Sequence, residues 1–358
     1  MRKRIRPSDE VVQQNIKEWH IPQPEHEYTV LIHCTTYNHG KYIKDALDGF
    51  VNQKCSYPFC AIIIDDCSTD NAPDIIREYA GKYPDIIKPI LLGENHMQHG
   101  ILRDPYFEKW HNSAKYIAFC EGDDYWIDAL KLQKQVSFLE NNPEYGMVYG
   151  KARFWKDGKV FGSHGTADCS FEGLLTYSNF PTLTRVFRKT IENRYFDEVA
   201  PRSMPWMMGD YPQAFYYVLN SKIKFFDEYF AVYRLLDSSA SHSKDVEYLF
   251  KFYDSADDVR RYFVNNYVAE NDKKQMYLHL IKEREIEYKI SLLLNCNKIN
   301  EARTLYVQNN DALCTYNRVK FYLSTKSLLL YKVIIYIQKI VSYSIIIRNR
   351  IFQKSLVC

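Results

Sequence analysis

The sequence has little of several features that would identify common protein classes. It has only 13 Gly and 13 Pro in 358 residues, which excludes collagen-like and linker-type chains. It has no run of about 18 uncharged apolar residues, so no transmembrane helix is predicted. The basic start, MRKRIRPSDE, is not followed by an apolar run and so lacks the pattern of a secretory signal peptide. We therefore expect a folded protein of the cytoplasm.

The nine cysteines are scattered, and no two of them form a CxxC pair. This spacing excludes a zinc knuckle and a thioredoxin-like site. Cys34, Cys60 and Cys120 lie in apolar runs. The pattern favours buried free thiols in a reducing compartment.

The net charge of +3 is distributed unevenly. Residues 312–358 contain eight Lys or Arg and no Asp or Glu, so the other 311 residues carry a net charge of −5. An acidic body argues against nucleic acid as the main partner. The basic tail points instead to contact with an anionic surface.

The first half of the chain alternates apolar runs with helical spacing. The runs predict strands at Tyr28–His33, Phe59–Ile64, Ile87–Leu92 and Lys115–Cys120, and the spacing predicts helices at Gly40–Gln53, Pro73–Tyr83 and Ala129–Asn141. This order is typical of an α/β fold, with a mostly parallel central sheet flanked by helices. Further on, Thr182–Arg188 and Ile223–Arg234 are predicted strands, with a helix after Asp210 between them.

From Asp245 onward the pattern is helical, which predicts a domain boundary near residue 240. We therefore expect an N-terminal extension at 1–27, an α/β domain at 28–240 and a helical region at 245–358. The apolar tail of that region, from about residue 318, carries Lys and Arg but no acid. Two interpretations of the tail stay open: a helix packed on the preceding helices, or an interfacial helix on anionic lipid.

Polar and acidic residues follow every predicted strand of the first half, where ligands bind in open α/β sheets. The segment EGDDYW places Glu121, Asp123 and Asp124 at one strand end. Such a cluster is stabilised by a divalent cation, and carboxylate oxygens suit Mg²⁺ or Mn²⁺. The simpler alternative is a solvated acidic turn.

A second acidic pair, Asp65 and Asp66 in IIIDDCSTD, follows a run of three isoleucines. A carboxylate in that position can accept hydrogen bonds from a base or a ribose. Asp70 fits a helix cap. Tyr37 offers a flat surface for a base, although an ordinary half-buried tyrosine explains it equally well.

The ordered segments TTYNHGKYI, IIIDDCSTD, FCEGDDYW and KLQKQ resemble the inverting family 2 glycosyltransferases with the GT-A fold, of the bacterial surface-polysaccharide type. The resemblance covers about Tyr28 to Leu236. It implies transfer of a sugar from a nucleotide donor, most often a UDP-sugar, to an acceptor hydroxyl of a glycan or a lipid-linked glycan. If the basic apolar tail is interfacial, the protein would be attached peripherally to the inner face of the cell membrane.

The same resemblance assigns roles to individual residues. Thr35, Tyr37 and Asp66 would hold the uracil and its ribose, Asp123 would bind the metal with Asp124 beside it, and Asp210 in GDYP would be the catalytic base. Arg234 would reach the diphosphate. Asn38, Asp65 and Asn95 complete the donor-binding candidates.

Two positions depart from the family pattern. Glu121 stands where the DxD metal motif commonly has aspartate, so it is the less certain metal ligand. Leu236 stands where a metal-binding histidine often follows the closing YR, and His242 lies six residues later. Other functions stay open at this point: a sugar nucleotidyltransferase, which would usually have a glycine-rich basic loop after its first strand, or a non-catalytic nucleotide- or glycan-binding module.

Overall fold

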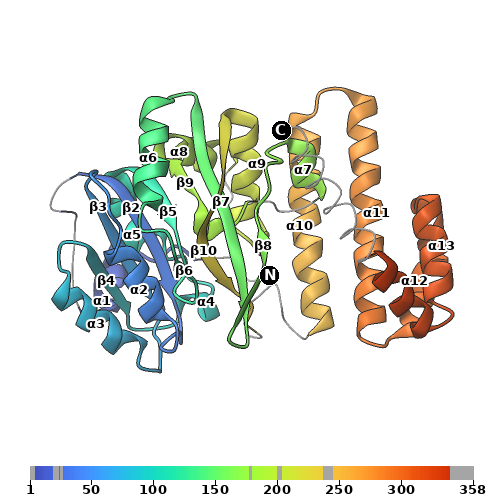
Figure 1. The fold of residues 1–358 in the computed structure, drawn as a ribbon, viewed down its shortest axis with the longest axis horizontal. Helices are drawn as coiled ribbons and strands as arrows, with labels where there is room; N and C mark the ends of the chain where they lie inside the picture. Colours follow the sequence, from blue (N-terminus) through green and yellow to red (C-terminus); the bar gives the residue numbers. More distant parts are fainter. Residues whose placement is uncertain are drawn as a thin grey trace, which may run out of the picture. The chain divides into compact units, whose positions relative to one another are not determined.

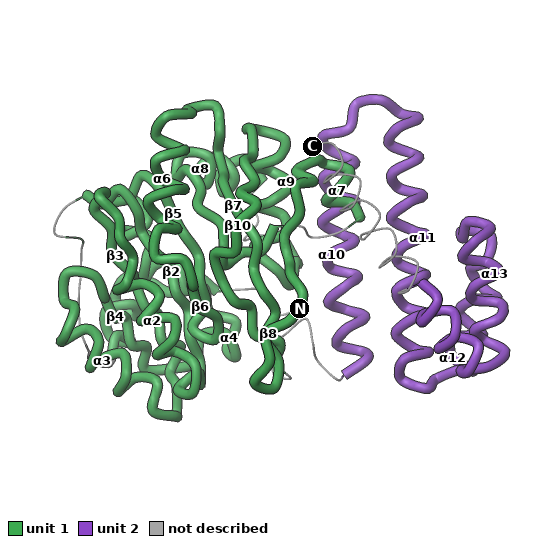
Figure 2. Tube along the Cα trace, viewed as in Figure 1, with its two compact units in different colours: residues 1–239 green, residues 240–358 purple. Residues whose placement is uncertain are grey.

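The computed structural model describes residues 5–18, 24, 27–176, 180–199, 204–236 and 245–338. The chain divides into two compact units, residues 1–239 and 240–358 (Figure 2). His242 and the tail beyond residue 338 lie outside the described residues.

Unit 1 is built on a ten-stranded mixed sheet (Figure 1). The strands are β1 (Ile16–Glu18), β2 (Tyr28–Thr36), β3 (Phe59–Asp65), β4 (Ile87–Leu92), β5 (Ala114–Phe119), β6 (Tyr125–Trp126), β7 (Tyr145–Lys156), β8 (Lys159–His164), β9 (Val186–Arg188) and β10 (Lys222–Arg234). Their order is β1-β4-β3-β2-β5-β9-β7-β10-β6, with β8 paired to β7. The pairs β4–β3, β3–β2, β2–β5 and β7–β10 are parallel, and the other pairs are antiparallel.

The helices of unit 1 connect these strands. They are α1 (Asp9–Asn15), α2 (Ile43–Val51), α3 (Ala72–Lys82), α4 (His96–His99), α5 (Asp104–Asn112), α6 (Lys131–Asn141), α7 (Phe171–Thr176), α8 (Lys189–Glu198) and α9 (Asp210–Asn220), with a short 3₁₀ turn η1 (Thr182–Thr184). In α2, Ile43, Leu47 and Phe50 recur at helical spacing and are fully buried. This apolar stripe packs α2 on the sheet.

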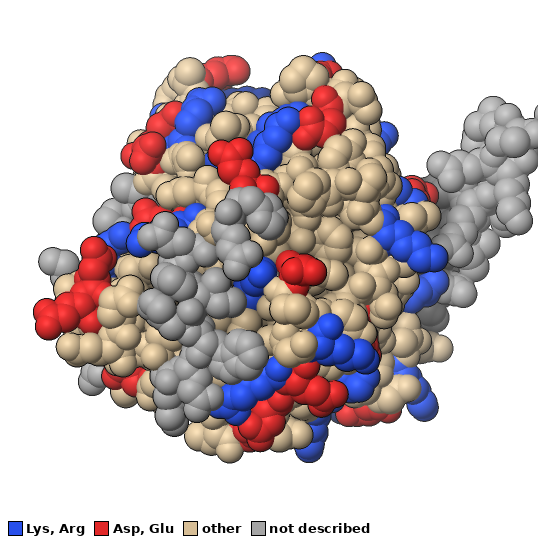
Figure 3. Space-filling view, turned by 90° about the vertical axis from the view of Figure 1, so that its left-hand side faces the viewer, with Lys and Arg blue, Asp and Glu red and all other residues tan. Residues whose placement is uncertain are grey.

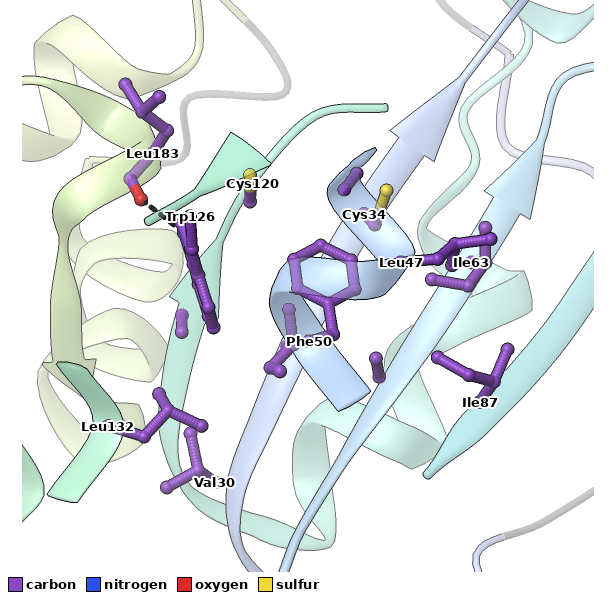
Figure 4. Packing of buried hydrophobic residues seen from close by; sticks show 14 of the residues in the cluster. Val30, Cys34, Leu47, Phe50, Ile63, Ile87, Cys120, Trp126, Leu132 and Leu183 are labelled. Atoms are coloured by element: carbon purple, nitrogen blue, oxygen red, sulfur yellow. Dashed lines mark hydrogen bonds between the residues drawn. The ribbon is translucent and has the colours of Figure 1, made fainter. Parts of the chain in front are cut away.

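A core of buried apolar side chains lies between the sheet and its helices (Figure 4). Val30 and Cys34 of β2 contribute to it, together with Phe50 of α2. Phe50 meets Trp126 edge to face with ring centroids 5.1 Å apart. The indole Nε1 of Trp126 donates a 2.7 Å hydrogen bond to the carbonyl oxygen of Leu183. A single aromatic pair thereby ties α2, β6 and η1 together.

The predicted α/β class is confirmed, and the structure refines the predicted elements. The predicted strand Thr182–Arg188 is instead the 3₁₀ turn η1 followed by the short strand β9. Helix α2 begins at Ile43 rather than Gly40, because the loop before it bonds to the loop after β3. Helices α4 and α5 were not predicted.

Unit 2 consists of helices. They are α10 (Val246–Tyr267), α11 (Asn271–Asn295), α12 (Ile299–Asn309), the 3₁₀ turn η4 (Asn310–Ala312), α13 (Thr315–Ser324) and a helix at 328–338. The Asp245 carboxylate caps α10 by accepting bonds from the amides of Glu247 and Tyr248. Ile290, Leu294 and Phe321 lie in a separate apolar core. Among the described residues, no helix combines the length and apolar character needed to cross a bilayer.

Candidate functional site

The carboxyl ends of three adjacent strands form the floor of the candidate site. β2 pairs in parallel with both β3 and β5, so the three strands end at the same edge of the sheet. The amide of Gly122 donates to the carbonyl of Thr35 across 2.9 Å, and the amide of Asp66 donates to that of Thr36 across 2.9 Å. The segments that follow the three strands are therefore held side by side, as ligand sites of open α/β sheets require.

The absence of a side chain at Gly122 allows the acidic segment after β5 to lie close to the end of β2. A Cβ at this position would stand 2.6 Å from Thr36 Oγ1 and 2.8 Å from the Cδ1 atom of Ile43. Any larger residue would push Asp123 away from the end of β2.

Asn38 and Asp65 join the loops after β2 and β3. Asn38 has a positive φ of 54°, a conformation that asparagine tolerates well. The main-chain amide of Asn38 donates to Ser68 Oγ, and the Asn38 side-chain Oδ1 accepts from the main-chain amide of Thr69. Both hydrogen bonds are 2.8 Å long. Asp65 Oδ2 accepts from the Ser68 amide across 2.9 Å. Both side chains shape the loops, while Thr35 and Tyr37 lie half-buried at the end of β2.

Asp66 and Asn95 hold the first turn of α4. The buried Asp66 carboxylate accepts from the amides of His96 and Met97 across 2.9 and 3.1 Å. Asn95 Oδ1 accepts from the Gln98 amide across 2.8 Å. A guanidinium nitrogen of Arg103 lies 4.0 Å from Asp66 Oδ2.

Arg103 was not predicted from the sequence. The one feature that could have identified it is its position as a single basic residue directly after the polar segment GENHMQHGIL. The residue lies just before α5, and its positive charge acts on Glu121 as well as on Asp66. It is therefore a cation placed between two acidic strand ends, suited to an anionic ligand.

Asp124 is the most buried acid of the group after β5. Its Oδ1 accepts a 2.7 Å bond from the Arg234 amide. Burial, followed by the charge of Asp123, raises the pKa of Asp124 well above its usual range. This carboxyl joins β10 to the acidic loop.

The Arg234 side chain supports the same loop. It donates to the main-chain carbonyl of Asp123 across 2.6 Å and to the carboxylate of Asp45. Its guanidinium carbon lies 4.4 Å from the ring centre of Tyr125 and 5.0 Å from that of Tyr42. Arg234 is thus enclosed by aromatic rings and hydrogen-bonded to protein atoms.

Glu121 and Asp123 are the acids of this loop that keep exposed surface. Asp123 Oδ2 is 4.0 Å from His39 Nε2, and Asp123 Oδ1 is buried without a hydrogen-bond partner. Glu121 keeps an exposed surface, yet the surrounding protein and then the charges of Asp123 and Asp210 raise its pKa to about 7.

Several unpartnered polar atoms gather here. They are Thr36 Oγ1, His39 Nδ1, Asp123 Oδ1 and Arg234 Nε. Buried polar atoms are almost always paired in folded proteins, so this cluster can bind a water, an ion or a ligand. Within the described ranges, no group of three His, Cys, Asp or Glu side chains could hold a metal alone. The residues still fit Mg²⁺ or Mn²⁺, because such ions are often held by one or two carboxylates together with substrate phosphates.

Asp210 joins the site from a distant part of the chain. It is the first residue of α9, and its Oδ2 accepts a hydrogen bond from the Thr182 hydroxyl. The fully buried Arg185 donates to the Asp210 carbonyl across 3.0 Å and to that of Phe180 across 3.1 Å. Since Asp210 and Asp123 both raise the pKa of Glu121, the three acids lie in one electrostatic neighbourhood. Thr182 and Arg185 were not predicted.

A buried chain of polar groups lies under α5. His33 Nδ1 of β2 is 2.8 Å from His111 Nε2, and His111 Nδ1 is 3.4 Å from a Glu192 carboxylate oxygen. Lys189 donates to the same oxygen across 2.8 Å. Burial, followed by the charges of His111 and Arg103, holds the pKa of His33 well below its usual value. This chain connects β2, α5 and α8 beside the site.

The surface around unit 1 carries both signs of charge. On the face drawn in Figure 3, described Lys and Arg side chains are interspersed with Asp and Glu rather than gathered by sign.

Comparison with known proteins finds relatives of this chain among glycosyltransferases. Residues 32–209 match the family model described as Glycosyl transferase family 2. An uncharacterized protein of Mycobacterium tuberculosis is 35% identical over 204 residues, which is 56% of this chain and 56% of that protein. TuaG of Bacillus subtilis, whose name assigns it to teichuronic acid biosynthesis as a glycosyltransferase, is 35% identical over 105 residues, 29% of this chain and 39% of TuaG.

The fold is also found in solved structures. TarS of S. aureus, solved as residues 1–349 in complex with UDP-GlcNAc, aligns with a TM-score of 0.55 at 16% identity. The alignment covers 83% of this chain and 91% of that one. The chain spans only 56% of the mycobacterial relative, so the match is to a domain. Through that domain the chain belongs to glycosyl transferase family 2.

Proposed function

We propose that the protein is a metal-dependent inverting glycosyltransferase. It moves a sugar from a nucleotide-sugar, a UDP-sugar by preference, to a hydroxyl group of a glycan or lipid-linked glycan. The observation that carries the proposal is that Asp210, the first residue of α9, lies near enough to Glu121 and Asp123 after β5 to act on the Glu121 charge, beside a buried carboxylate oxygen that has no partner. Such proximity of acids is costly unless a cation or a reacting proton offsets it.

The donor nucleotide would lie over the ends of β2 and β3. Thr35, Tyr37, Asn38, Asp65, Asp66 and Asn95 line this edge, and Arg103 supplies a positive charge for the diphosphate. UDP-GlcNAc bound to TarS, a protein of the same fold, supports a uridine nucleotide. Asp66 already accepts two backbone bonds, and an ionised carboxylate has about four acceptor sites, so it can still accept from a base.

The cation would be held by Asp123, with Glu121 as a less certain second ligand and Asp124 beside them. When bound there, Mg²⁺ or Mn²⁺ would supply positive charge to offset the negative charge of the leaving diphosphate. The Arg234 guanidinium holds the Asp123 main chain, so its role is to position the acidic loop beside the diphosphate.

Asp210 would act as the base. An acceptor hydroxyl is a weak nucleophile, so a carboxylate must take its proton as it attacks the anomeric carbon. The bond between the sugar and the diphosphate breaks as the new glycosidic bond forms. Thr182 holds one oxygen of the Asp210 carboxylate, which leaves the other to receive the proton. With a single base opposite the leaving group, one displacement inverts the anomeric configuration.

The acceptor is proposed at the level of its class. The assignment of TuaG to teichuronic acid biosynthesis supports a surface polysaccharide or its lipid-linked precursor. A lipid-linked acceptor would place the reaction at a membrane surface.

A screen of nucleotide-sugars for thermal stabilisation, with and without Mn²⁺, tests the proposal. We expect a UDP-sugar to raise the melting temperature only in the presence of Mn²⁺ or Mg²⁺, and to release UDP when a glycan acceptor is added. Stabilisation without turnover on any acceptor would favour a binding module. Pyrophosphate exchange with UTP would instead favour a nucleotidyltransferase.

A further inference from the structure

The helix at 328–338 exposes an apolar face to solvent. Its exposed large side chains are Leu329, Leu330, Val333, Tyr336 and Ile337, with exposed fractions of 70% for Leu329 and 66% for Tyr336. These positions follow the spacing i, i+1, i+4, i+7 and i+8, which gathers them on one side of a helix. In an ordinary surface helix that side would be polar.

The opposite side of this helix is also apolar, and it is packed. Tyr331 is buried and its hydroxyl donates to the carbonyl of Ser291 in α11 across 3.4 Å. Leu328 and Ile335 pack on the same core. The packed side therefore fixes the helix on unit 2. The exposed apolar side chains are a second face of the same helix, separate from the face that packs in the core.

α13 extends this surface. Its exposed apolar residues are Tyr316, Val319, Tyr322 and Leu323. Gln338 donates to the Tyr316 hydroxyl across 2.6 Å, which joins the two helices along the exposed side. Together they hold nine of the 19 exposed large apolar side chains in the part of the chain that the structure describes. We call these nine residues the apolar outer face.

The two helices that carry the apolar outer face contain basic residues and no acidic residue, while Glu283 and Glu287 of α11 are bonded to Asn317 and Lys320 of α13. Arg318, Lys326 and Lys332 are exposed there, and residues 312–358 contain no acid. A second copy of the chain docked through the same face would set these cations against their own counterparts. Residues 339–358 add only basic charges, so they do not neutralise the face either. The charge complement must come from an anionic partner.

We propose that the apolar outer face binds an anionic lipid surface. Lipid meets both requirements at once, because the acyl boundary takes up the apolar side chains while the headgroups pair with Arg318, Lys326 and Lys332. Tyr316, Tyr322 and Tyr336 suit the headgroup level, where amphipathic rings gather.

Vesicle sedimentation of the full chain tests this, with no donor or acceptor present, so that its outcome is separate from that of the transfer reaction. The chain should sediment with phosphatidylglycerol vesicles at low salt and not with phosphatidylcholine vesicles. Leu329→Ser with Val333→Ser should weaken binding roughly tenfold or more. The matched control, Val307→Ser with Met276→Ser, changes exposed apolar residues of α12 and α11 and should bind as the wild type does.

Charge-reversal variants distinguish an anionic lipid surface from other occupants of the apolar outer face. Lys326→Glu with Lys332→Glu should weaken binding by at least tenfold, since each basic residue near an anionic surface contributes about fivefold. Lys251→Glu, an exposed residue of α10, should have little effect. Wild-type protein that ignores phosphatidylglycerol vesicles at low salt overturns the proposal. The proposal is also overturned if the Leu329→Ser, Val333→Ser variant binds vesicles normally but changes its oligomeric state or lowers its melting temperature. The occupant of the apolar outer face would then be protein.

Discussion

The guanidinium of Arg234 donates a 2.6 Å hydrogen bond to the main-chain carbonyl of Asp123, which lies 111 residues earlier in the chain. The Arg234 amide also donates to the Asp124 side chain. One residue at the end of β10 thus holds two successive acids of the loop after β5. We infer that the acidic loop depends on Arg234 for its position rather than on its own sequence.

Arg234→Lys tests that dependence. A lysine lacks the planar, forked guanidinium that bridges Asp45 and the Asp123 carbonyl. The free energy of unfolding of the variant should therefore fall by about 1–3 kcal/mol. Affinity for UDP with Mn²⁺ should fall with it. Denaturant titration and calorimetry measure the two effects, and Arg153→Lys, a change at an exposed residue of β7, is the matched control. Full donor affinity in Arg234→Lys would show that the loop holds its shape unaided.

Asp210→Asn addresses the proposed base. The amide oxygen can still accept from Thr182, so the fold and UDP affinity should be nearly unchanged. Turnover should fall by roughly 10²–10⁴, the loss expected when a general base is removed. Asp197→Asn, an exposed change at the end of α8, should keep its rate. An Asp210→Asn enzyme with more than about a tenth of the wild-type rate would exclude this residue as the base.

Acidification should destabilise the protein through His33. Its pKa in the folded chain lies below the usual value of 6.5, so the unfolded chain binds a proton that the folded chain refuses. The stability is present above pH 6.5 and is lost as the pH falls below it, toward the lower folded pKa. His111, Glu192, Lys189 and Arg103 are the charged or titratable groups around it.

His33→Asn separates this effect from general acid unfolding. The asparagine amide can still donate to His111 but does not titrate, so its melting temperature should fall less between pH 7.5 and pH 5 than that of the wild type. Identical pH profiles for the two proteins would mean that another group titrates in this range.

The sequence predicted the parts of the fold that depend on local patterns. Four apolar runs predicted β2, β3, β4 and β5 within a few residues, and helical spacing predicted α2, α3 and α6. α5 was missed because Tyr106, Phe107 and Trp110 look like an irregular aromatic stretch until the sheet is there to bury them.

The acidic residues at the strand ends were predicted for the same reason, because each follows a strand that the apolar pattern predicts. The residues that hold these acids in position were not predicted. Thr182 meets Asp210 across 28 residues, and Asp45 meets Arg234 across 189 residues. Such contacts are set by the packed sheet and leave no mark in local spacing.

The most direct measurement is a calorimetric titration of UDP into the full chain, with and without Mn²⁺, for the wild type and for Asp123→Asn. Replacing Asp123 by asparagine removes a negative charge close to Glu121 and Asp124, so the variant should stay folded. Asp85→Asn, an exposed change before β4, is the control. The wild type and the control should bind UDP at least roughly tenfold, or about 1.4 kcal/mol, more tightly with Mn²⁺. Asp123→Asn should bind equally weakly with and without the metal. An Asp123→Asn protein that keeps the full Mn²⁺ enhancement would contradict the placement of the metal and the donor at this edge of the sheet.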